Sequence, residues 1–65
     1  MKFDDFLREL AKDSELKELI DKALEKKETG EKLCFILEYN YLLWLFTKKI
    51  RYEDIKEDVR KILVK

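Results

Sequence analysis

One run of the sequence, LCFILEYNYLLWLF at residues 33–46, is far more apolar than the rest of the chain. It interrupts a sequence in which 46% of the residues are charged, compared with roughly 25% in ordinary domains. The run is 14 residues long and contains Glu38 and Asn40, whereas a membrane-spanning helix needs about 20 apolar residues. A run of this length is typical of a buried helix, so we expect no membrane span.

The rest of the chain has the spacing of amphipathic helices. Apolar side chains recur at the i, i+3, i+4 intervals of a helix within residues 3–11, 16–24 and 55–63. The apolar run belongs to a longer helix, expected at about residues 31–49. These segments predict an all-α fold, a compact bundle of three to four helices around the central apolar helix. The length suits one domain, so residues 1–65 are assigned to a single helical domain.

Short polar residues mark the expected boundaries between these helices. Asp13 or Ser14 can cap the second helix, because a side-chain oxygen at that position accepts a hydrogen bond from a free backbone N–H group. Thr29 is the candidate cap of the long helix, and Gly30 supplies the backbone freedom that a corner needs. A short link at residues 50–51 is expected to lead into the last helix.

The small size of the chain raises the question of what stabilises it. A domain this short buries only roughly 60% of the surface of its unfolded chain, and disulfides, metals or oligomerisation often compensate. Cys34 is the only cysteine and histidine is absent, which excludes an internal disulfide and the usual kind of zinc site. Dense helix packing or oligomerisation remains, and we predict a homodimer.

Two apolar faces appear when the long helix is drawn at about 100° per residue. One is an aromatic-rich stripe of Phe35, Tyr39, Leu42 and Phe46. The other has the spacing of a coiled-coil seam, at which a single Asn can set the register, and it comprises Leu33, Ile36, Asn40, Leu43, Thr47 and Ile50. The expected solvent-facing arc comprises Cys34, Glu38, Tyr41, Leu45, Lys48 and Lys49.

Three short amphipathic helices are too few to cover both apolar faces of the long one. We therefore expect one face to meet a second chain, and the Asn40 seam, with Trp44 beside it, is the predicted one; the alternative is that both faces belong to the protein's own core. Trp and Tyr anchor protein interfaces most often. The predicted interface residues are Tyr39, Asn40, Tyr41, Trp44 and Phe46, and the predicted role is that of a small protein–protein interaction module, namely a regulator, adaptor, inhibitor or assembly subunit.

The alternative function is nucleic-acid binding through the basic C-terminal region. Residues 48–65 hold 7 basic and 4 acidic side chains, although the whole chain has a net charge of zero. A dedicated nucleic-acid binder normally has a basic excess, and the apolar helix exposes too few polar groups to read base edges. The residues that would serve this alternative are Lys48, Lys49, Arg51, Arg60 and Lys61.

Catalysis has little support in the sequence, and we predict no enzyme, cofactor, metal or small-molecule substrate. Histidine, the commonest general base, is absent. Glu31 and Glu38 oppose thiolate formation at Cys34, which we expect to be a small, partly buried apolar residue. Abundant Glu and Lys with a single Asn indicate heat adaptation, and the absence of a signal-peptide pattern near the first residue indicates a cytoplasmic protein.

Overall fold

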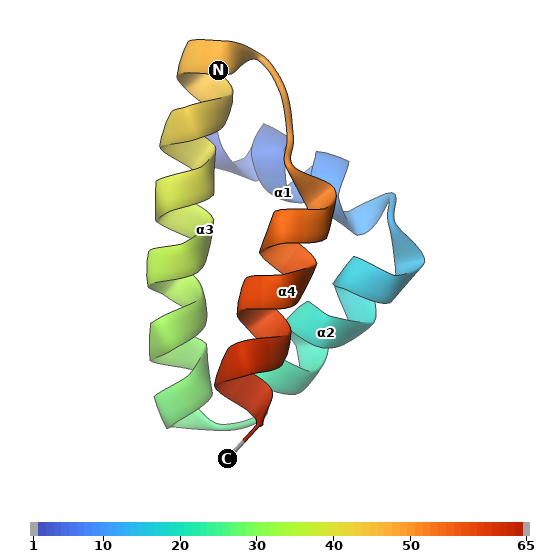
Figure 1. The fold of residues 1–65 in the computed structure, drawn as a ribbon, viewed down its shortest axis with the longest axis vertical. Coiled ribbons are helices and arrows are strands. Elements are labelled where there is room, and N and C mark those ends of the chain that lie inside the picture. The colour runs from blue at the N-terminus through green and yellow to red at the C-terminus, as the bar shows by residue number, and fades with distance from the viewer. Residues whose placement is uncertain (1, 65) are drawn as a thin grey trace.

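The computed structural model describes residues 2–64 and consists of four α-helices with short connections (Figure 1). In chain order they are α1 (Phe3–Ala11), α2 (Ser14–Leu24), α3 (Lys27–Thr47) and α4 (Tyr52–Leu63). No strand occurs among residues 2–64. The predicted all-α bundle is confirmed, including the fourth helix and the link at residues 50–51.

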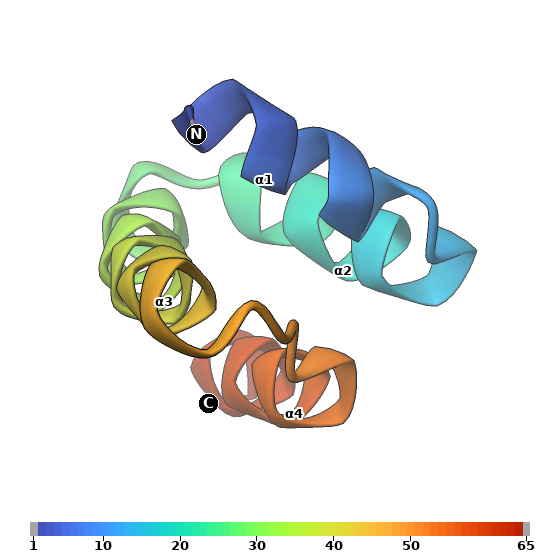
Figure 2. The same ribbon diagram turned by 90° about the horizontal axis from the view of Figure 1, so that it is seen from above.

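The four helices are not arranged evenly around α3. Helix α4 packs against both α2 and α3, helix α2 also packs against α3, and α1 lies along α2. Figure 2 shows α1, α2 and α4 all on the same side of α3, and no helix of residues 2–64 lies on its other side. The longest and most apolar helix therefore has one side in the bundle and one side outside it.

The core lies between the helices and draws side chains from all four. The largest fully buried side chains are Phe6, Leu10, Leu16, Leu33, Ile55 and Val59. Each side chain of this size contributes roughly 1.5–3 kcal/mol when it leaves water. Aromatic rings extend the core towards the end of α3, because the Phe6 ring lies 5.7 Å from Tyr41 and 5.5 Å from Trp44, centroid to centroid. Helix α1 thus packs against α3 through aromatic contacts.

The boundary between α1 and α2 follows the predicted capping chemistry. Asp13 is the N-cap of α2, and its Oδ1 accepts a hydrogen bond from the Leu16 backbone N–H at 3.1 Å. The extended backbone of Asp13 breaks the helical path, so α1 and α2 are separate helices. The phenolic oxygen of Tyr52 donates to the carbonyl oxygen of Glu9 at 3.4 Å and so joins the start of α4 to α1.

The predicted bounds of α3 are wrong at both ends. The helix begins at Lys27, so Thr29 and Gly30 lie inside its first turn and neither makes the corner. Thr29 is buried because its hydroxyl donates to the Ala23 carbonyl oxygen, 2.5 Å away, near the end of α2. The helix ends at Thr47, and Lys48 takes the left-handed conformation (φ 61°) that commonly terminates helices.

The apolar run does not produce a membrane-spanning segment. Within residues 2–64, each helix is too short or too polar to cross a bilayer.

Candidate functional site

Helix α3 has two apolar faces, and they point in opposite directions. Its inner face buries Thr29, Leu33, Leu37 and Asn40 against the other helices. Its outer face has four large side chains that we call the outer stripe: Phe35 (74% exposed), Tyr39 (60%), Leu42 (53%) and Phe46 (85%). Their spacing of four, three and four residues places them on one line along the helix, about 145° around the helix from the inner face.

The predicted interface residues are divided between these faces. Tyr39 and Phe46 belong to the exposed outer stripe. Asn40 is only 6% exposed, and its Nδ2 donates to the Ile36 carbonyl oxygen at 2.8 Å. Tyr41 and Trp44 are partly buried and contact the Phe6 ring. The structure therefore does not bring the five residues together on one surface.

The seam that contains Asn40 faces the protein's own core. Leu33 is 1% exposed there, because α2 and α4 both pack against α3. The spacing in the sequence identified both apolar faces. The prediction favoured the Asn40 seam as the exposed face, but the seam is buried and the other face is exposed. The outer stripe, with its residues Phe35 and Leu42, is the surface that this assignment missed.

The expected solvent-facing arc of α3 also needs correction. Tyr41 and Leu45 are partly buried, since α1 lies over this part of the helix and places the Phe3 ring 5.2 Å from Tyr41. Cys34 is exposed, which agrees with its place in that arc and corrects the separate expectation that it is partly buried. It lines an apolar hollow of about 280 Å³ between α1, α2 and α3, bordered also by Leu24 and Glu38.

The basic residues of the alternative function lie in two groups at opposite ends of α4. Lys48, Lys49 and Arg51 lie in the connection between α3 and α4, whereas Arg60 and Lys61 lie in the last turn of α4. Two of these five side chains, Arg51 and Arg60, already form ion pairs. Arg51 forms an ion pair with Asp54, and Arg60 forms ion pairs with Glu15 and Glu57. The five residues thus do not form a continuous basic patch.

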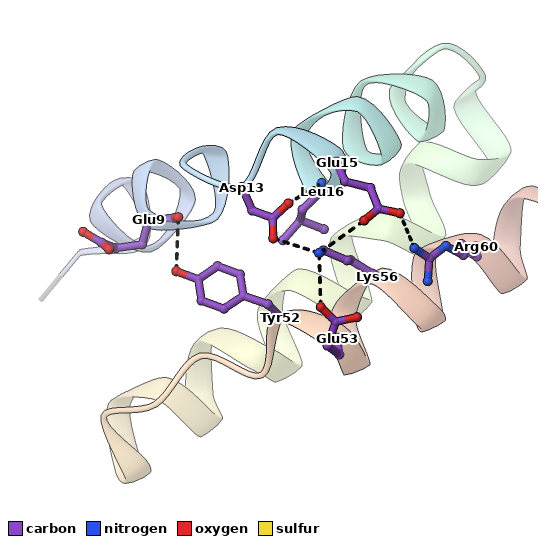
Figure 3. Close-up of polar contacts among 8 residues, drawn as sticks. All are labelled: Glu9, Asp13, Glu15, Leu16, Tyr52, Glu53, Lys56 and Arg60. Carbon is purple, nitrogen blue, oxygen red and sulfur yellow. Dashed lines mark hydrogen bonds and ion pairs between the residues drawn. The ribbon is translucent and has the colours of Figure 1, made fainter.

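Lys56 is a buried cation that forms ion pairs between α4 and the beginning of α2 (Figure 3). The sequence-based predictions did not include it. The Lys56 side chain is 8% exposed, and its Nζ lies 2.8 Å from Asp13, 3.2 Å from Glu53 and 3.3 Å from Glu15. Lys56 falls on the apolar face of α4, between Ile55 and Val59. A lone lysine among apolar positions was the available signal.

The pKa values of these groups shift in the directions expected for a fixed ion cluster. The hydrogen bond from Lys56 lowers the pKa of Asp13, assisted by the Leu16 N–H group. Hydrogen bonds from Arg60 and then Lys56 lower the pKa of Glu15. In return, the carboxylates, Asp13 first, raise the pKa of Lys56 above its ordinary value of 10.5. Asp13 therefore both caps α2 and holds α4 beside it.

The described residues show neither an unpaired buried polar side-chain atom nor a cluster of metal-binding side chains. No buried side-chain nitrogen or oxygen lacks a hydrogen-bond partner in the described part of the chain. Over the same residues, no group of three or more His, Cys, Asp or Glu side chains is arranged to hold a metal ion. Comparison of the chain with protein-family models, with curated proteins and with solved structures finds no match.

Proposed function

We propose that this protein is a small protein–protein interaction module, and that the outer stripe of α3 is its contact surface. A role as regulator, adaptor, inhibitor or assembly subunit fits a domain of this size, and a homodimer is the simplest form of such an assembly. The observation that supports the proposal is the exposure of Phe35, Tyr39, Leu42 and Phe46 along one line of a helix. Uncovered apolar patches on folded proteins commonly mark interaction sites.

The area and surroundings of the stripe support this proposal. Three aromatic side chains of about 200 Å² each, more than half exposed, and Leu42 together present about 500 Å² of mainly apolar surface. The largest apolar patch of a typical monomer is roughly 300–600 Å² and is often functional. Glu31, Lys32 and Glu38 are exposed beside the stripe. An apolar centre with a polar rim is the usual composition of an interface.

A protein partner fits this surface better than a nucleic acid does. The outer stripe itself contains no cation, and Glu38 beside it would repel phosphates. Binding of nucleic acid would require Arg51 and Arg60 to leave carboxylate partners. We also propose a cytoplasmic setting, since the lone thiol of Cys34 is exposed and a reducing compartment would protect it.

The test compares substitutions on the outer stripe with a substitution at an exposed apolar position outside it. Phe46→Glu, alone and with Phe35→Glu, places a charge on the outer stripe, whereas Val64→Glu changes a residue that is 75% exposed but lies outside the stripe. Circular dichroism would establish that all variants remain helical. Sedimentation velocity and affinity capture from a native extract would then measure association, with the chain itself or with another protein.

We expect the double stripe variant to lose association at least tenfold and the Val64→Glu control to retain it. The reason is that a buried, unpaired carboxylate costs several kcal/mol in an apolar interface. Association that is equally strong in all variants, or that is absent from the unmodified protein under every condition, would contradict the proposal.

A further inference from the structure

The spacing of the outer stripe is symmetric along the helix. Its spacings are four, three and four residues, so the pattern is the same when it is read from either end. Phe35 and Phe46 lie at equal distances from the middle of the stripe, and so do Tyr39 and Leu42. At a rise of 1.5 Å per residue, each outer Phe lies about 8 Å from this middle and each inner residue about 2 Å.

We propose that a second copy of this chain covers the outer stripe, with the two α3 helices antiparallel about a two-fold axis at the middle of the stripe. The inference rests on the proposed function and adds its partner and register. Phe35 of one copy then lies opposite Phe46 of the other, and Tyr39 opposite Leu42. A two-fold axis perpendicular to both helices makes every contact twice, which is the usual form of a homodimer interface.

The charges at the two ends of α3 favour this direction. Glu31 is exposed near the N-terminal end of the stripe, and Lys48 and Lys49 are exposed just beyond its C-terminal end. Antiparallel pairing brings Glu31 near Lys49 of the second copy, whereas parallel pairing would bring the lysines of both copies together. Lys32, the basic neighbour of Glu31, projects about 100° away around the helix, on the other flank. The helix dipoles also oppose each other favourably in the antiparallel arrangement.

The size and accessibility of the surface suit a second copy. Two stripes of about 500 Å² bury about 1,000 Å² in total, the lower size limit of specific interfaces. Figures 1 and 2 agree that none of the helices in the described part of the chain lies on the outer side of α3, so a second α3 can approach along its whole length. Helix pairs pack at 8–10 Å between axes, which is close enough for the four side chains to interdigitate.

Disulfide trapping of the 65-residue chain tests both the partner and the register. The exposed Cys34 is first replaced (Cys34→Ser), and one cysteine is then introduced at Leu42, Phe46 or Val64. A disulfide requires Cα atoms within about 7 Å. Across the proposed axis, two copies of position 42 are offset along the helices by about 4–5 Å, whereas two copies of position 46 are offset by about 16 Å. Sedimentation of the unmodified protein gives its oligomeric state.

We expect a concentration-dependent dimer and disulfide formation by Leu42→Cys at least tenfold faster than by Phe46→Cys or the Val64→Cys control. A mixture of Phe35→Cys and Phe46→Cys chains should form the mixed disulfide. Trapping of Phe46→Cys as fast as Leu42→Cys would overturn the antiparallel register. If the protein is a monomer at high micromolar concentration, the proposal that a second copy covers the outer stripe is overturned. These results would leave the proposed function standing. The proposed function is contradicted by a different result, namely that the substitutions on the outer stripe change neither self-association nor binding to any other protein.

Discussion

Both faces of α3 have large apolar side chains, but one face is buried and the other is exposed. Leu33 and Leu37 on the inner face are 1% and 7% exposed, whereas Phe35 and Phe46 on the outer face are 74% and 85% exposed. Both faces would look like core on a helical wheel, and the outer one is the more aromatic. The comparison shows that apolar character indicates which side chains are stabilised by burial. The positions of the other helices decide which of these side chains are buried.

The largest expected effect comes from the same substitution made on each face. Leu33→Ala should cost about 2–5 kcal/mol in the free energy of unfolding, because it opens a cavity in the core. Leu42→Ala removes the same atoms from a side chain that is already 53% exposed, and it should cost less than about 1 kcal/mol. Urea denaturation at low protein concentration, where association contributes little, measures both values.

Equal losses from Leu33→Ala and Leu42→Ala would break the distinction between the faces. A cost of Leu42→Ala that grows with protein concentration would instead sharpen it, because the contribution of the outer face would then come from association.

A second, smaller effect concerns the cluster that holds α4 against the inner side of the bundle. Lys56→Met keeps the apolar stem of the side chain but removes the charge between Asp13 and Glu15. We expect a loss of stability near neutral pH that is smaller than the loss in Leu33→Ala. Lys17→Met is the matched control, because its ion pair with Asp21 is more than half exposed and is worth about 0.5 kcal/mol or less.

The pH dependence of the Lys56→Met effect follows from the directions of the pKa shifts. Asp13 and Glu15 have pKa values below their ordinary 3.8 and 4.5, so their stabilisation is present above those values and is lost as the pH falls through the lowered ones. Lys56 has a pKa above 10.5, so its stabilisation is present below that value and is lost at higher pH.

The stability difference between the unmodified protein and Lys56→Met should therefore be greatest between about pH 5 and pH 10 and should shrink on both sides. Chemical denaturation over a pH series measures the difference. A difference that does not change with pH would contradict a stabilising contribution from the charge of Lys56.

The smallest effect is expected for Asn40→Leu. The quantity to measure is the oligomeric state of this variant. Asn40 lies on the inner face and donates to its own helix, at the Ile36 carbonyl, so the substitution should leave the stoichiometry of any assembly unchanged. Because the bond is satisfied within the chain, the unfolding free energy should change by less than about 1.5 kcal/mol. A new stoichiometry in sedimentation would show that the Asn40 seam, and not the outer stripe, meets the second chain.

Periodicity and capping chemistry were sufficient to predict most of the secondary structure. The i, i+3, i+4 spacing of Phe6 and Leu10 identified the buried side of α1. Asp13 was one of the two candidate caps, with Ser14, because capping chemistry is local. The start of α3 was missed because Thr29 makes a tertiary bond to the Ala23 carbonyl. Such a bond depends on where α2 ends in space, which spacing along the chain does not reveal.

The candidate site was only half predictable for the same reason. The aromatic stripe and the Asn40 seam were both visible, but their burial depends on α1, α2 and α4 lying on one side of α3. Tyr41 was expected in solvent, and it is covered by Phe3 and Phe6 of α1. Lys56 was overlooked because charge usually indicates a solvated position, whereas three carboxylates around its Nζ compensate for its burial.

The sequence by itself determined that the chain forms helices, that one of them is apolar around most of its circumference, and that the spacing of Phe35, Tyr39, Leu42 and Phe46 is symmetric. These properties depend on side-chain type and on helix geometry alone. Only the tertiary structure decided which side of α3 is buried, because burial is set by the packing of segments that are distant in the chain. Three helices cover one side of α3, and the symmetric stripe is on the other.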